Sequence, residues 1–203
     1  MTDYCYTEIV AYGSIDDVRR LHDFLSLDNG GFSFDRFIPM PEDIYQGDLG
    51  PTERELYGAN NWHDWRCENW DTKWDCDEVS VTLLEGSASA HLSIVYRSPW
   101  RSSFPVSKVL ALSNPNLKFL MKFEDECSYG KATVCMFDAN GGFREAIEEE
   151  AVPHEHNGSL DLGFSYTANA DFLEEWSTNA LVQKSMTLLG YGSDERQAML
   201  IAA

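Results

Sequence analysis

Residues 60–74, NNWHDWRCENWDTKW, are the part of the chain whose residue types are best suited to recognition or chemistry. Tryptophan buries a large surface and carries one hydrogen-bond donor, so a cluster of tryptophans is typical of a small aromatic core or of a binding surface. Charged and amide side chains lie between the indoles, which is unusual for a plain core element. The segment therefore predicts a specialised structure or a site, without specifying a reaction. Its tryptophans are Trp62, Trp65, Trp70 and Trp74, four of the six in the protein.

Three polar side chains of this segment, His63, Asp64 and Asn69, mark the place where a small enzyme would have its site. A catalytic site needs a nucleophile or a general base with a partner that activates it. The sequence contains no nucleophile elbow, zinc-protease motif, phosphate-binding loop or dinucleotide-binding motif. Its Ser, Cys and Thr residues have no partner that the sequence assigns. Catalysis is therefore the weaker hypothesis, and we predict no catalytic residue and no cofactor.

Partial sets of metal ligands occur at two places. Cys67 and Cys76 lack the paired spacing of a structural zinc site, which needs four ligands. His63 with Cys67 makes only one pair on a helix face. The tract of residues 154–156, His-Glu-His, is better explained as an exposed polar strand or loop. We therefore predict no metal site.

Two interpretations of the tryptophan segment stay open. In the structural one, the indoles pack an insertion onto the open face of a sheet, and neighbouring polar side chains pair the groups that burial would leave unpaired. In the functional one, Trp62, Trp65 and Trp70 form part of a protein-binding hot spot, where tryptophan is enriched. Acidic neighbours argue against a base-stacking platform. The candidate partner-binding residues are Trp62, Asp64, Trp65, Asn69, Trp70, Lys73 and Trp74.

The chain is strongly acidic, with 34 Asp and Glu against 15 Lys and Arg and a formal net charge of −19. Such a surface repels nucleic acid and disfavours anionic membranes, because both are bound through basic side chains. It attracts a basic partner from a distance. The alternatives are an ordinary solvated surface and an acidic decoy for a nucleic-acid-binding protein. We predict a protein partner with a basic surface, no direct nucleic-acid binding and no membrane contact.

One stretch departs from this acidity. Residues 86–123 contain no acidic residue but five Lys and Arg. A neutral or basic face there would permit a nucleic-acid contact, which is a second hypothesis for function. The basic residues are Arg97, Arg101, Lys108, Lys118 and Lys122.

Length and composition are those of one globular domain, or of one domain with an elaboration. The 203 residues are 43% hydrophobic, which is enough for a sizeable core. The sequence lacks the run of about 18 apolar residues that a membrane span needs, and its N-terminus lacks the pattern of a signal peptide. Five cysteines at irregular spacing indicate reduced thiols, so we expect a cytoplasmic protein.

Apolar periodicity predicts the elements of an α+β fold. Their order, strand-helix-strand-strand-helix-strand, is that of the antiparallel ferredoxin-like βαββαβ sheet, here with an insertion at 32–77 after the first helix and one extra strand. Within the insertion, Pro51 predicts the start of a helix that continues into the tryptophan segment, with a break at residues 58–61. The strands are expected at 4–12, 79–83, 90–96, 117–123 and 132–136, and the main helices at 15–27 and 104–112.

The pattern weakens beyond residue 140. We expect a solvated acidic run at 148–150, a loop at 152–163 and a last amphipathic helix from Asp171 to about Gly190. Residues 1–140 are thus expected to form the ferredoxin-like domain with its insertion, and residues 141–203 a helical C-terminal extension packed on it.

The proline segment at 37–41, FIPMP, followed by NNWHDWR at 60–66 and ENWDTKWD at 68–75, resembles the YubB-like family of plasmid and phage proteins. That family has a comparable motif pair in an insertion of a ferredoxin-like domain, with glycine where this chain has Asp71. The resemblance covers residues 1–140 and implies no catalytic residue, since the family's activity is uncharacterised. It implies a mobile genetic element in a bacterial host, where small acidic proteins act as counter-defence inhibitors of the anti-restriction or anti-CRISPR type.

Overall fold

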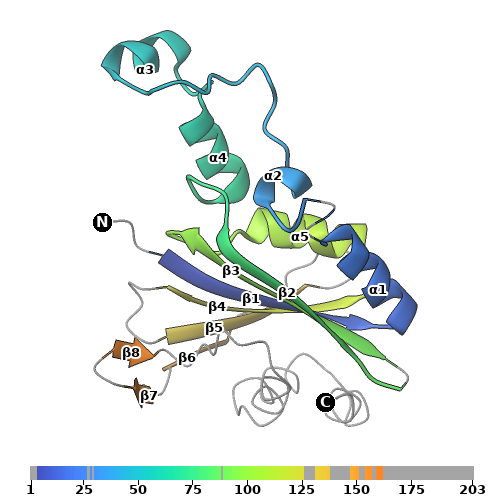
Figure 1. Ribbon diagram of the computed structural model, residues 1–203. Helices are drawn as coiled ribbons and strands as arrows, with labels where there is room; N and C mark the ends of the chain where they lie inside the picture. Colours follow the sequence, from blue (N-terminus) through green and yellow to red (C-terminus); the bar gives the residue numbers. More distant parts are fainter. Residues whose placement is uncertain are drawn as a thin grey trace.

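The computed structural model describes residues 4–26, 28, 30–87 and 89–123 with their side chains (Figure 1). It describes the backbone alone for residues 124–125 and for four further strands between 131 and 161. The predicted helix that begins at Asp171 lies outside the described residues. None of the described helices is long and apolar enough to cross a membrane.

The centre of the fold is an antiparallel sheet, so the protein belongs to the α+β class. Its strands lie in the order β2-β3-β1-β4-β5-β6. Two further short strands form a separate two-stranded sheet. The strands are β1 (Tyr4–Gly13), β2 (Asp77–Glu85), β3 (Ala90–Pro99), β4 (Lys118–Asp125), β5 (Lys131–Phe137), β6 (Ile147–Glu150), β7 (His154–His156) and β8 (Ser159–Asp161).

The five predicted strands are confirmed as β1 to β5, whereas β6, β7 and β8 were not predicted. The acidic run at 148–150 lies in β6, where Glu148 is opposite Thr133 of β5. The expected loop at 152–163 contains the β7–β8 hairpin. Strands of three or four residues are too short to show a clear alternation of apolar and polar residues, so local periodicity does not report them. β6 also joins residues beyond 140 to the main sheet.

Alternating side chains of β1 and β3 form the core on one face of the sheet. Ile9 lies opposite Ile94, and Ala11 lies opposite Leu92. All four are buried, as β-branched and aliphatic residues on the inner face of a sheet should be.

Two helices, α1 (Ile15–Phe24) and α5 (Phe104–Ser113), cover this face of the sheet (Figure 1). Ser14 and Ser103 cap them, with side-chain oxygens accepting hydrogen bonds from backbone N–H groups in the first turn. α1 ends three residues before the predicted Leu27, and the buried Leu25 closes it.

The insertion contains three helices, α2 (Phe34–Phe37), α3 (Pro51–Tyr57) and α4 (Trp62–Trp70). The predicted break between the second and third of these is confirmed. The expectation that the insertion covers the open face of the sheet is wrong, because α2 and α4 lie on the side of α1 and α5 (Figure 1). The reason is Tyr96, whose ring points to the helix side and contacts the ring of Phe34, which in turn packs edge to face against Trp70.

The opposite face of the sheet carries buried polar groups. Ser93 donates a hydrogen bond of 2.9 Å to the carboxylate of Glu8, and both residues are buried. His91 is 1% exposed and packs against the ring of Tyr12, 4.9 Å away. Neither ring nitrogen of His91 has a hydrogen-bond partner among the described residues. Burial disfavours the imidazolium and lowers the pKa of His91 to about 4.

We expect His91 to make the folded protein sensitive to acid. Because the pKa of His91 is about 4 in the folded chain and 6.5 for a histidine in water, the unfolded chain binds a proton first as pH falls. Stability is therefore lost between about pH 6.5 and pH 4. His91→Leu should reduce the loss of unfolding free energy between pH 7 and pH 4.5 by about 2 kcal/mol. Urea titrations at both pH values measure this, and equal losses in the variant and the parent would contradict it.

Candidate functional site

The part of the insertion farthest from the sheet is an exposed tip, which we define as residues 42–60. Figure 1 shows α3 held away from the sheet at the end of α4. α3 contains no buried residue, and the Leu56 side chain is 71% exposed. The tip has five acidic residues and one basic residue. It is thus a projecting acidic surface with an exposed apolar side chain.

The tip is attached to α4 through Trp62 and Tyr45. The Trp62 indole N–H donates to the carbonyl of Gly47 over 3.1 Å, and its backbone N–H donates to the carbonyl of Tyr45 over 2.8 Å. The Tyr45 ring stacks on Tyr57 with centroids 4.0 Å apart. Trp62 therefore has a structural use, since it fixes the loop that carries α3.

The polar residues at the start of α4 form a helix cap. Asn61 is fully buried, and its side-chain oxygen accepts from the backbone N–H groups of His63 and Asp64. The Asp64 carboxylate accepts from the Asn61 amide over 2.9 Å and lies 2.9 Å from Nδ1 of His63. The hydrogen bonds from His63 and Asn61 lower the pKa of Asp64.

These contacts weaken the hypothesis of an enzyme site. Asn69 donates to the carbonyl of Trp65 in the last turn of α4, whereas His63 and Asp64 belong to the first turn. Six residues along a helix correspond to about 9 Å. The three side chains therefore do not converge on one point, and their hydrogen bonds serve the helix itself.

Trp70 is part of the core. It is 1% exposed, and its indole N–H donates to the carbonyl of Ile38 over 2.9 Å. Phe34 and Trp65 pack edge to face against it. Trp65 is partly buried against the same core. For Trp70 the structural interpretation of the segment applies, because its indole is not accessible to a partner in this conformation.

Both basic side chains of the tryptophan segment lie over indoles. The Arg66 guanidinium is 5.4 Å from the ring centroid of Trp62 and 5.0 Å from that of Trp70. Its Nε is buried and has no hydrogen-bond partner among the residues that the structure describes. The π-faces of the two indoles compensate part of this burial, since they attract cations.

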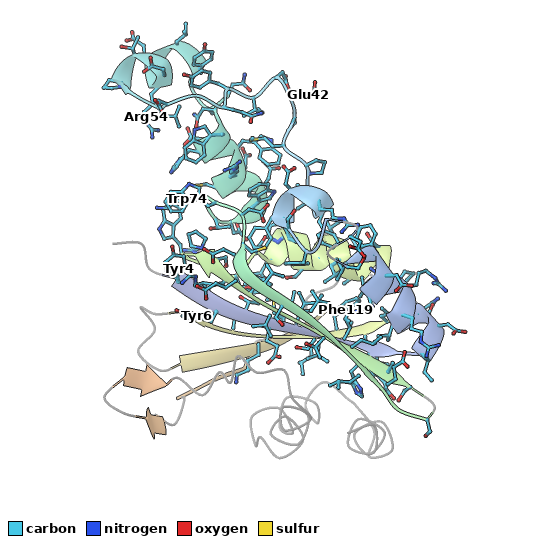
Figure 2. All side chains as sticks on the ribbon, in the orientation of Figure 1. Tyr4, Tyr6, Glu42, Arg54, Trp74 and Phe119 are labelled. Atoms are coloured by element: carbon cyan, nitrogen blue, oxygen red, sulfur yellow. The ribbon has the colours of Figure 1, made fainter. Side chains whose placement is uncertain are left out.

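Lys73 is the second of these cations, and its indole neighbours are exposed. Its Nζ lies 3.9 Å from the ring centroid of Trp74 and 4.8 Å from that of Trp100. Trp74 is 43% exposed and Trp100 is 37% exposed. Figure 2 shows Trp74 at the base of α4, close to the sheet. We call Trp74 and Trp100 the indole pair.

Sequence reasoning missed Trp100, which follows β3 and has no periodic pattern around it. A buried bond brings the pair together, because the Thr72 hydroxyl donates to the carbonyl of Pro99. Asp71, just before it, has φ 61 at the end of α4. Glycine adopts this left-handed conformation without strain, and aspartate is one of the few other residues found there several times more often than average. Burial raises the pKa of Asp71, and the charge of Arg101 opposes that shift.

Asp75 joins the two ends of the insertion. Its carboxylate accepts from the backbone N–H of Phe34 over 2.6 Å, that of Asp35 over 3.3 Å and that of Cys76 over 2.8 Å. These bonds hold the start of α2 beside the start of β2. The insertion is thus closed at its base by one carboxylate.

The thiols of the segment are not activated. Burial raises the pKa of Cys67 and, more strongly, that of Cys76. A thiol with a raised pKa is protonated at neutral pH and is a poor nucleophile and metal ligand. Among the residues that the structure describes, no group of three or more His, Cys, Asp and Glu is arranged to hold a metal ion.

The basic residues of the acid-free stretch do not gather on one surface. Arg97 forms ion pairs with Asp77 and Glu78, at 2.9 Å and 3.0 Å. Lys118 and Lys122 of β4 lie on the sheet face opposite the helices, according to the strand register. Arg101 lies in a loop, and Lys108 belongs to α5 on the helix side. Their distribution does not favour a nucleic-acid contact, which needs a continuous basic patch.

Asn61 and Asn60 provide a matched test of the helix cap. Asn61→Ala removes a buried cap with four hydrogen bonds. It should lower the unfolding free energy by about 2 kcal/mol. Asn60→Ala removes one exposed bond of 3.3 Å to the carbonyl of Asp43 and should change stability by less than about 0.5 kcal/mol. Urea unfolding of both variants measures the difference, and equal effects would exclude a capping role for Asn61.

Trp70 and Trp74 should respond in opposite ways to truncation. Trp70→Ala opens a cavity in the core and should cost about 3–5 kcal/mol of stability. Trp74→Ala removes a ring that is 43% exposed and lies outside the core cluster, and it should cost no more than about 1 kcal/mol. Thermal unfolding followed by circular dichroism distinguishes the two. A large loss of stability in Trp74→Ala would mean that this indole is structural.

Comparison of the chain with protein-family models, with curated proteins and with solved structures found no match. What the protein does must therefore follow from the geometry and chemistry of its own residues.

Proposed function

We propose that this chain is a non-enzymatic binding protein whose exposed tip docks on a basic surface of a protein partner. The observation that carries the proposal is the tip itself, where a helix without buried residues displays Leu56 among acidic side chains. An apolar contact surrounded by charges that match the partner is the usual composition of a protein–protein interface.

The energetics of α3 indicate that this helix serves to contact a partner and contributes little to the stability of the fold. A helix of seven residues is marginal in water on its own. α3 buries none of its residues, so it adds little apolar burial to the core. Hydrogen bonds from Trp62 and the stacking of Tyr45 on Tyr57 nevertheless hold it in one place. A rigid exposed element of this kind lowers the entropy cost of binding.

Charge favours the same class of function. The net charge of −19 steers a basic partner toward the protein, and the insertion from 32 to 77 contains eleven acidic and four basic residues. The dispersed basic side chains do not favour a nucleic-acid partner. The separation of His63 from Asn69 and the raised pKa values of Cys67 and Cys76 argue for binding over catalysis.

We also propose that β1 to β4 with α1 and α5 form a ferredoxin-like core. The order β1-α1-β2-β3-α5-β4 along the chain and the antiparallel order β2-β3-β1-β4 across the sheet support this. On the resemblance to YubB-like proteins, the partner would be a nucleic-acid-handling protein of a bacterial host. The chain would then act in the cytoplasm as a counter-defence inhibitor encoded by a plasmid or phage.

Neutralising the tip should abolish partner binding. The test variant carries Glu42→Gln, Asp43→Asn and Glu55→Gln, which remove three exposed acids of the tip. Its matched control carries Asp16→Asn, Asp23→Asn and Asp28→Asn, which remove three exposed acids on and after α1. In affinity capture from a bacterial lysate, the tip variant should lose its protein partner at least about tenfold, since each interface charge contributes to steering and affinity.

The control should keep the partner, because its three substituted acids lie outside the tip. It has the same net charge as the tip variant, so the two differ only in where charge is removed. Capture by the unmodified chain should weaken as salt is raised from 50 to 500 mM, since ions screen the contact. An equal loss of captured partner in both variants would show that binding depends on net charge and not on the acids of the tip. Undiminished capture by the tip variant would contradict the proposal.

A further inference from the structure

Trp100 has an unusual backbone conformation for so large a residue. Its φ is 70, in the left-handed region. The Arg101 N–H donates to the carbonyl of Pro99 over 2.9 Å, which closes a three-residue γ-turn with Trp100 at its centre. A γ-turn with positive φ is rare and strained, and a bulky side chain at such a φ is a true outlier.

Bonds on both sides hold the γ-turn in place. The Ser98 hydroxyl donates to the carbonyl of Arg101 over 2.7 Å, and the Thr72 hydroxyl donates to the carbonyl of Pro99. Ser98 and Thr72 are both buried. A strained residue persists only where its surroundings determine its conformation in this way, and such residues concentrate at functional sites.

Stability alone does not explain Trp100. Trp100 packs edge to face against His63, 6.2 Å away, but stays 37% exposed, whereas the core residue Trp70 is 1% exposed. Glycine would adopt the same φ without strain. The strained turn places an indole at the surface, beside Trp74 of the insertion.

The indole pair is suited to a cation. Both rings lie within 4.8 Å of the same ammonium group, that of Lys73. Cations bind over indole faces because the ring quadrupole attracts positive charge, and a guanidinium also stacks on the ring. The chain as a whole carries a net charge of −19. The net negative charge of the chain thus attracts a positively charged side chain of a partner at long range. The two indole faces attract it at short range.

We propose that Trp74 and Trp100 bind an arginine side chain of the protein partner, and that Lys73 occupies their faces until this arginine displaces it. The inference rests on the proposed function in one respect, the basic nature of the partner. It adds a second contact at the base of the insertion, separate from the tip. It also explains the strained turn, which holds the Trp100 indole in a position where the arginine side chain can stack on it.

The direct test uses a peptide probe, Gly-Arg-Gly-Arg-Gly, and the same peptide with citrulline, which is neutral and similar in shape, in place of arginine. Binding is followed by NMR of the ¹⁵N-labelled full chain, with each indole N–H signal assigned from a Trp→Phe variant. The arginine peptide should shift the Trp74 and Trp100 signals and leave that of the buried Trp70 in place. Equal shifts with the citrulline peptide would overturn the proposal.

Trp100→Gly separates this site from general attraction to an acidic surface, because it leaves the net charge at −19. The variant relieves the strained φ while it removes the indole, so its thermal midpoint should change by only a few degrees. Its affinity for the arginine peptide should fall at least tenfold. Unchanged affinity would overturn the proposal.

Lys73→Met tests the displacement. Without the resident ammonium, the arginine peptide should bind about three- to tenfold more tightly. Lys108→Met, an exposed lysine on α5, makes the same change in net charge and should alter affinity by less than twofold. Weaker peptide binding by Lys73→Met would overturn the proposal, since Lys73 would then support the site instead of occupying the place of the arginine.

The tip variant of the preceding section distinguishes the two proposals. Peptide binding that Trp100→Gly abolishes and the tip variant retains supports the indole pair whether or not the tip docks. Lysate capture that the tip variant loses and Trp100→Gly retains supports the tip and overturns the indole pair.

Discussion

The burial of Trp70 is the interaction on which the position of the insertion depends. Its ring lies against Phe34, and its N–H is paired with the carbonyl of Ile38, so one side chain joins α4 to α2 and to the chain that leads to the tip. Phe34 contacts Tyr96 of the sheet. The rigid direction of α4, and with it the placement of α3, follows from this packing because close-packed aromatic rings allow few alternative arrangements.

The same residues divide the tryptophan segment into a structural and an exposed part. Trp70 and the capping residue Asn61 are buried and belong to the core. Trp62 anchors the tip, and Trp74 is exposed beside Lys73. A segment that alternates between these uses needs both aromatic and polar residues. This explains its composition better than either of the two interpretations that the sequence left open.

The electrostatic surface of the insertion is uneven, because the two basic side chains of the tryptophan segment lie over indoles. The half-buried Arg66 lies over the indoles of Trp62 and Trp70, and Lys73 lies over two exposed ones. Arg97 is neutralised by Asp77 and Glu78. The acidic groups of the tip are thus left to dominate the projecting end of the insertion, where they act at long range on an approaching partner.

The sequence by itself determined the strands β1 to β5, the helices α1 and α5 and the break between α3 and α4, because these depend on local periodicity, caps and breakers. Tertiary structure alone decided the side on which the insertion packs and the role of Trp100. Both depend on contacts between distant residues: Tyr96 with Phe34, and Thr72 with the carbonyl of Pro99. A side chain's neighbours across such distances leave no trace in the spacing of residues along the chain.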